Sequence, residues 1–308
     1  MTYSIIQKSQ LEGALRLDAE YFQPDFLEYE KEVSKFNLNK LNAMCSIITQ
    51  GPNPIFQNSG IPCVNGRNVR NCRLELNNPN FISHEEFKKL KRFRIRQGDI
   101  LITLKGLGSI GKLGYVNNDT MAIFSRDIGL IRTKDINTSK FIFAFLLSKH
   151  GYSQIEKSIS GGTGQLTLTT SSIKEINVPK LKSNSIKEIV TAIEKSEQLF
   201  SNSNLFFKQA EDSLLEELCL KDFKKKNELF SVVNLSEVQS ANRIDAEYFQ
   251  PKFAQLINKL TEIKSEPLSN VLESVPAKFN PLSQPEKEFT YIELSNIDLS
   301  SGTINGSS

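Results

Sequence analysis

The sequence predicts an α+β fold: a strand-rich domain, then a long helix of the coiled-coil type, then the start of a second, duplicated domain. Three observations predict it. A nonamer occurs twice, short apolar runs alternate with turn residues, and an apolar row recurs with a period of seven. We place the domains at residues 1–180, 181–226 and 227–308, the last being an incomplete copy of the first.

The repeated nonamer reads Arg-Leu-Asp-Ala-Glu-Tyr-Phe-Gln-Pro from Arg16, and it returns from Arg243 with isoleucine in place of leucine. Its offset of 227 residues far exceeds the roughly 20–50-residue period of solenoids and propellers, so it indicates a duplicated domain. Both copies end in proline, at Pro24 and Pro251, where the first turn of a helix tolerates a missing N–H group. Each nonamer therefore predicts a helix that begins at its proline.

The second copy continues the likeness at an offset of 228, where Asn296-Ile297 matches Asn68-Val69. It stops at Ser308, which corresponds to about residue 80 of the first copy. We expect either a fragment of a longer protein or the product of a short gene.

Short strands are predicted between residues 41 and 135, and the clearest is Ile100–Leu104 after the turn Gly98-Asp99. A buried helix is predicted over Phe141–Lys149, and Ile173–Val178 ends the domain before Pro179. The other predicted strands lie within residues 47–48, 61–69, 113–116, 121–124 and 128–132.

Residues 183–222 have the heptad pattern of a long helix packed closely on another helix. Small residues follow three positions after most members of the apolar row, and residues 186–218 would form a rod of roughly 50 Å. A long helix within the core of one domain is the alternative. The predicted packing residues are Ile186, Ile189, Ile193, Phe200, Phe207 and Leu214.

Composition excludes several classes of protein. A hydrophobic content of 39% and a charged content of 24% suit a globular chain, and the net charge of +3 permits an acidic partner. The four cysteines form no CxxC pair and there are two histidines, so we expect neither a metal site nor a disulfide framework. Without a signal peptide or an apolar run long enough to span a bilayer, we expect a cytoplasmic protein with no membrane partner.

Motifs that would carry catalysis fail on their context. The run from Gly106 to Lys112 matches GxGxxG and most of a P-loop, but Leu113 replaces the required serine or threonine and the following residues are strand-like. The run Asn78-Pro79-Asn80-Phe81 lacks the second proline of the amino-methyltransferase signature. We therefore predict no catalytic residues.

Basic clusters are more informative. Residues 88–96 hold six cations, and Arg67, Arg70 and Arg73 are spaced by three beside asparagines. Arginine and asparagine read guanine and adenine edges, and lysine suits phosphates. A merely solvated charged surface is the alternative. The candidate DNA contacts are Arg67, Asn68, Arg70, Lys91, Arg92, Lys105, Lys112 and Gln165.

The duplicated nonamer with a long helix between its copies resembles the specificity (S) subunit of type I restriction–modification systems. Gly98-Asp99-Ile100-Leu101, residues 161–165 and Ile176-Asn177-Val178-Pro179 are also similar to ends and loops of that family's target recognition domains. The resemblance implies a non-catalytic subunit that directs methyltransferase (M) and restriction (R) subunits to a bipartite site in double-stranded DNA.

The resemblance also implies that S-adenosylmethionine, ATP and magnesium belong to the partner subunits, and that the S subunit carries no cofactor. Because the second domain is incomplete, two chains could pair through the 186–218 helix and read a palindromic site. A protein-interaction scaffold without DNA specificity, and a DNA methyltransferase or nuclease with an unrecognised site, are the alternatives.

Overall fold

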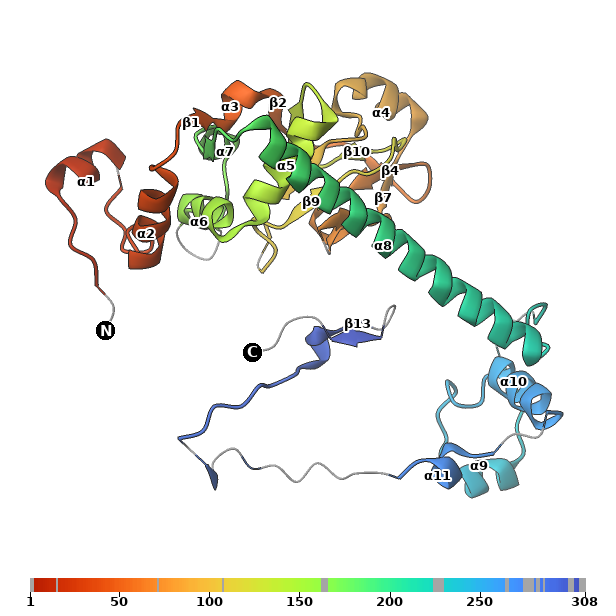
Figure 1. Ribbon diagram of the computed structural model, residues 1–308. Helices are drawn as coiled ribbons and strands as arrows, with labels where there is room; N and C mark the ends of the chain where they lie inside the picture. The colour runs from red at the N-terminus through yellow and green to blue at the C-terminus, as the bar shows by residue number, and fades with distance from the viewer. Residues whose placement is uncertain are drawn as a thin grey trace. The chain divides into compact units, whose positions relative to one another are not determined.

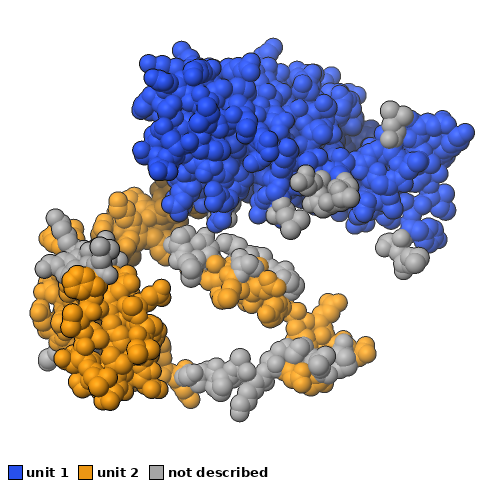
Figure 2. All heavy atoms as spheres, turned by 180° about the vertical axis from the view of Figure 1, so that it is seen from behind, with its two compact units in different colours: residues 1–197 blue, residues 198–308 orange. Residues whose placement is uncertain are grey.

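The structure is a computed structural model, which describes residues 3–14, 16–70, 72–106, 108–161, 166–223, 230–263, 266–273, 280, 283–284, 286–298 and 302–304. It divides into two compact units, residues 1–197 and 198–308, coloured blue and orange in Figure 2. Strands and helices together build the first unit, which confirms the predicted α+β class.

Two sheets form the centre of the first unit. The six-stranded sheet has the order β2 (Cys45–Gln50), β11 (Ile128–Thr133), β8 (Ile100–Thr103), β9 (Leu113–Tyr115), β6 (Arg73–Leu74) and β5 (Val69–Arg70). The four-stranded sheet has the order β10 (Ile123–Phe124), β4 (Ile61–Val64), β7 (Asn80–Ile82) and β3 (Phe56–Gln57). A separate ladder pairs β1 (Leu38–Lys40) with β12 (Asn177–Pro179), so distant parts of the chain meet there.

Strand β8 is buried on both of its faces, which confirms the strand predicted from Ile100. Ile100 and Ile102 belong to one apolar cluster and Leu101 to another, since successive side chains of a strand point to opposite faces. A buried ion pair joins β8 to β11. Arg132 donates two hydrogen bonds to the carboxylate of Asp99, from Nε to Oδ1 and from Nη2 to Oδ2, each at 2.7 Å. Asp99 is 1% exposed.

The predicted helix over Phe141–Lys149 is wrong in its bounds, because the chain forms two helices there. Ser148 has extended backbone angles and its hydroxyl accepts a hydrogen bond from Gly151, so it ends one helix and caps the next. A Cβ on Gly151 would lie 2.1 Å from the carbonyl oxygen of Phe145, so this abrupt turn requires glycine. The helices of the unit are α1 (Lys8–Ala14), α2 (Pro24–Val33), α3 (Leu41–Met44), α4 (His84–Lys89), α5 (Ile136–Leu147), α6 (Lys149–Ser158) and α7 (Thr170–Lys174), with the 3-10 turns η1 (Gly66–Asn68) and η2 (Lys91–Phe93).

The long helix predicted from the heptad row is present as α8 (Ser183–Glu217). Its first turns lie beside α5 (Figure 1), where Lys140 Nζ is 3.2 Å from Glu194 Oε1 and 3.3 Å from Glu197 Oε2. Ile186 and Ile189 pack against the larger apolar cluster of the first unit. These two isoleucines therefore serve the domain itself in this structure.

The rest of the heptad row on α8 becomes progressively exposed. Ile193 is half-buried, whereas Phe200, Phe207 and Leu214 are 38%, 54% and 59% exposed. An amphipathic helix with such a row normally packs on another helix.

The second unit repeats the local structure of the nonamer. Arg243 pairs with Asp245 and lies 4.6 Å from the ring centre of Tyr248, as Arg16 pairs with Asp18 and lies over its own tyrosine. The nonamer thus encodes a compact turn before a helix in both copies. The elements of this unit are α9 (Leu235–Ala241), α10 (Pro251–Thr261), α11 (Leu268–Val271), the 3-10 turn η4 (Leu294–Asn296), β13 (Ile297–Asp298) and β14 (Thr303–Ile304).

Candidate nucleic-acid interface

Four of the predicted contacts line one open hollow of about 470 Å³ on the first unit. Arg67 belongs to η1 and Arg70 ends β5, whereas Lys105 follows β8 and Lys112 precedes β9. These pairs are far apart in sequence. They meet because β6, the partner of β5, joins the sheet at β9, where Arg73 pairs with Tyr115.

The glycine-rich run beside Lys105 connects two antiparallel strands. β8 and β9 pair directly, with Ile102 opposite Leu113, so a strand follows the loop where a nucleotide-binding loop requires a helix. Gly106, Gly108 and Gly111 have φ angles of 116°, 69° and 81°, which only glycine adopts readily. The loop therefore presents its lysines from a tight turn.

The four cations of this hollow outnumber the one described carboxylate that lines it, Asp127. Arg67, Arg70 and Lys112 are exposed and Lys105 is half-buried. Across the part of the chain that the structure describes, none of the four forms an ion pair. Clustered cations without carboxylate partners repel one another and favour binding of an anion.

Asn68, the fifth predicted contact in this region, has a structural role instead. Its side chain is 1% exposed, and its Oδ1 accepts a hydrogen bond from Asn65 N at 3.1 Å. Its Nδ2 donates to the carbonyl oxygens of Glu75 and Asn77, at 2.9 and 3.2 Å. Because every polar atom of the amide is engaged inside the loop, Asn68 holds η1 in place and does not belong in the contact set.

The duplicated copy supports a structural role for Asn68 that differs from the role of the exposed arginines beside it. Asn296 Oδ1 accepts from Glu293 N at 2.8 Å, so the asparagine keeps its capping role in the second unit. At the same offset, Arg67 and Arg70 correspond to serine and aspartate at positions 295 and 298. The scaffold residue is retained between the copies, whereas the exposed cations are not.

The remaining predicted contacts lie elsewhere. Lys91 and Arg92 are exposed on η2 and do not line the hollow, and Arg92 lies 4.6 Å from the ring centre of Phe93. Gln165 lies outside the described residues. The chain on its C-terminal side is anchored beside Lys105, which forms a β-bridge with Thr167. Asn80 and Asp127 also line the hollow, although neither belongs to the basic or glycine-rich runs from which the contacts were predicted.

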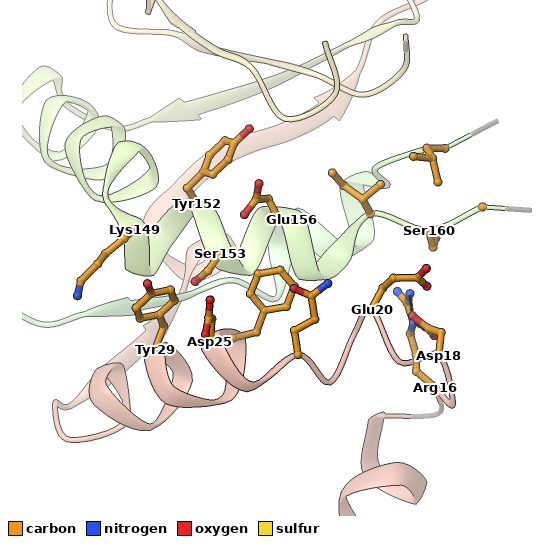
Figure 3. Close-up of a pocket in the computed structure, with 15 residues that line it drawn as sticks. Arg16, Asp18, Glu20, Asp25, Tyr29, Lys149, Tyr152, Ser153, Glu156 and Ser160 are labelled. Atoms are coloured by element: carbon orange, nitrogen blue, oxygen red, sulfur yellow. Dashed lines mark hydrogen bonds and ion pairs between the residues drawn. The ribbon is translucent and has the colours of Figure 1, made fainter. Parts of the chain in front are cut away.

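A second hollow, of about 910 Å³, lies between the first nonamer, α2 and α6 (Figure 3). Its carboxylates outnumber its cations. The described carboxylates that line it are those of Asp18, Glu20, Asp25 and Glu156, and the cations are Arg16, which pairs with Asp18, and Lys149. Burial raises the pKa of Glu156, and the hydrogen bond from Arg16 lowers the pKa of Asp18. An acidic surface repels phosphate, so this hollow is unsuited to nucleic acid.

The described residues contain neither a metal-binding cluster nor a helix that could span a membrane. Within the ranges that the structure describes, no three His, Cys, Asp or Glu side chains are placed to hold a metal ion. In the same ranges, no helix is sufficiently long and apolar to cross a membrane.

Comparisons with known proteins place these features in a family. Residues 36–204 match the type I restriction modification DNA specificity domain. The chain is 26% identical over 178 residues to the EcoBI specificity subunit of Escherichia coli, covering 58% of this chain and 36% of that protein. It thus spans about a third of the length of this curated relative.

Solved structures show weaker, partial likeness. The S subunit of the type I restriction-modification system of M. genitalium is 15% identical, with a TM-score of 0.42 over 61% of this chain and 46% of that chain. The type IIG restriction endonuclease BpuSI is 10% identical, with a TM-score of 0.43 over 61% and 30% of the two chains. The family match spans more than half of the chain, from just before β1 to residue 204 within α8, and the chain therefore belongs to the type I restriction modification DNA specificity domain family.

Proposed function

We propose that this chain is a non-catalytic, sequence-specific DNA-binding subunit that directs methyltransferase and restriction subunits to a bipartite target. The observation that carries the proposal is the hollow lined by Arg67, Arg70, Lys105 and Lys112, four cations without ion-pair partners in the described structure. It lies within the residues that match a DNA specificity domain. Methylation would then be chemistry of the partner subunits, which would bring S-adenosylmethionine, ATP and magnesium.

The test is to co-express the chain with the methyltransferase subunit of its own system and to sequence the host DNA for modified adenine. We expect a split motif with a fixed gap. Two identical inverted halves would indicate a dimer of this chain, and two different halves would indicate a second complete recognition domain in a longer chain. Association with the methyltransferase subunit without any modified motif would favour a scaffold without DNA specificity.

The enzyme alternative has its own test. Purified chain that transferred a methyl group from S-adenosylmethionine, or cut DNA, in the absence of any partner would contradict the proposal. No feature of the described hollows favours this outcome, because neither combines a nucleophile with a positioned base.

The two kinds of cation in the basic hollow should contribute differently. Replacing Lys105 and Lys112 with methionine should weaken binding to all duplexes alike and reduce the slope of log K against log salt by about 1 per lost phosphate contact. Arg67→Met should cost roughly 1–3 kcal/mol on the preferred duplex and relax the preference at one position. Fluorescence anisotropy over a range of salt concentrations measures both effects.

The control for these variants is Lys31→Met, which removes an exposed lysine of α2 that does not line the basic hollow. It should leave the salt slope unchanged. Equal losses on every sequence for Arg67→Met would make Arg67 a phosphate contact instead of a base contact.

A further inference from the structure

One carboxylate lines the basic hollow among its four cations. Asp127 lies between β10 and β11, and its side chain is 45% exposed. In the described structure its single ion-pair contact is with the neighbouring Arg126, whose Nε is 3.9 Å from Asp127 Oδ1. Asp127 forms no ion pair with the four cations of the hollow, so its oxygens keep their capacity to accept hydrogen bonds from a ligand.

The backbone that carries Asp127 is fixed on both sides. Its carbonyl oxygen accepts a hydrogen bond from Leu104 N at 2.8 Å, at the end of β8. The carbonyl of Arg126 accepts from Gln50 Nε2 at 2.6 Å, and that of Ser125 accepts from Ile128 N at 3.0 Å. The backbone of Asp127 is thereby held beside the strands that precede Lys105 and follow Lys112, so its main chain needs no ordering before the carboxylate meets a ligand.

A carboxylate has a restricted set of partners on DNA. Phosphate and deoxyribose in the duplex backbone offer no hydrogen-bond donor, and phosphate repels a negative charge. The donors on exposed base edges are amino groups: N4 of cytosine and N6 of adenine in the major groove, and N2 of guanine in the minor groove. Asp127 therefore weakens binding to every sequence except one that places a base amino group against it.

Among the bases, cytosine suits a carboxylate best. Adenine presents its N7 acceptor beside its amino group, and the lone pair of N7 repels a carboxylate, whereas cytosine has no acceptor on that side of N4. We propose that Asp127 determines specificity by accepting a hydrogen bond from the N4 amino group of a cytosine in the target half-site. This inference rests on the proposed function, and it assigns a base to a residue that the sequence argument passed over.

The experiment compares wild type, Asp127→Asn and Asp127→Ala, each co-expressed with the methyltransferase subunit, by sequencing modified host DNA. Wild type is expected to require cytosine at one position of the half-site. Both variants should lose that preference by at least about tenfold, and the asparagine variant should gain adenine, which an amide contacts bidentately. Binding of the purified complex to duplexes that vary at this position gives the same comparison without methylation.

The matched control is Glu28→Gln, which removes a carboxylate from an exposed position of α2 outside both hollows. Its motif should equal that of wild type, as should the unfolding midpoints of all variants, because Asp127 is partly exposed in a turn. If both Asp127 variants kept the wild-type motif and bound every duplex more tightly by one common factor, Asp127 would be only a repulsive charge and the proposal would fail.

Two other outcomes are distinct from that one. A wild-type motif with an invariant adenine, relaxed by the Asp127 variants, would overturn the assignment of cytosine. No motif for wild type, despite association with the methyltransferase subunit, would overturn the proposed function and this inference with it.

Discussion

Replacing Arg132 with methionine is expected to lower the free energy of unfolding of the first unit by about 3–5 kcal/mol. The substitution leaves the carboxylate of Asp99, which is 1% exposed, without its cationic partner in the interior. It also removes the donor to the carbonyl oxygen of Arg94, at 2.9 Å. Urea unfolding followed by circular dichroism measures the loss as a lower midpoint at an unchanged slope.

The control for this variant is Lys40→Met, which breaks the ion pair of Lys40 with Glu175. Those side chains are 50% and 71% exposed, so the loss should stay below about 1 kcal/mol. Arg132→Lys should fall between the two variants, because lysine keeps the charge but cannot reproduce the paired donors of the guanidinium. Equal stability of Arg132→Met and Lys40→Met would show that the buried pair is not a principal support of the sheet.

This ion pair illustrates what local sequence can and cannot reveal. The run from Ile100 predicted its strand correctly, because a short β-branched and apolar run between turn residues is typical of a strand. The preceding Asp99 read only as a turn residue. Its partner is 33 residues away, and only the register of β8 against β11 brings them together.

The candidate interface shows the same limit. Arg67 and Lys105 were each proposed from their local surroundings, but their meeting in one hollow depends on the sheet edge formed by β9 and β6. Asn68 was proposed because asparagine reads adenine. Its neighbours in sequence cannot show that its amide already forms hydrogen bonds with the backbone of the loop. The internal repeat did contain that signal, since Asn296 is retained where the arginine positions change.

The break between α5 and α6 was missed for a related reason. The helix predicted over Phe141–Lys149 runs across Ser148, which is an N-cap only because its backbone is extended. Serine is also tolerated inside helices, so its identity alone does not decide between the two roles.

In a dimer that pairs through α8, replacing Phe207 and Leu214 together with glutamine is expected to weaken self-association by at least about 100-fold. Both side chains are more than half exposed on one face of α8, seven residues apart. Burying such a side chain contributes about 1.5–3 kcal/mol, and each substitution occurs twice in a symmetric dimer. Sedimentation equilibrium over a range of concentrations gives the dissociation constant directly.

The sharpest control uses the same chemistry on the opposite face of the helix. Leu205 is 51% exposed, close to the value for Leu214, and lies nine residues before it, which is about half a turn away around α8. Leu205→Gln should therefore leave self-association unchanged, whereas Leu214→Gln weakens it. If both leucine variants behaved alike, the apolar row would not be the surface through which two chains associate. If the wild-type chain were monomeric at all concentrations, the prediction of a dimer of the isolated chain would be wrong. The row would then be free to pack against a helix of another subunit or of a longer chain.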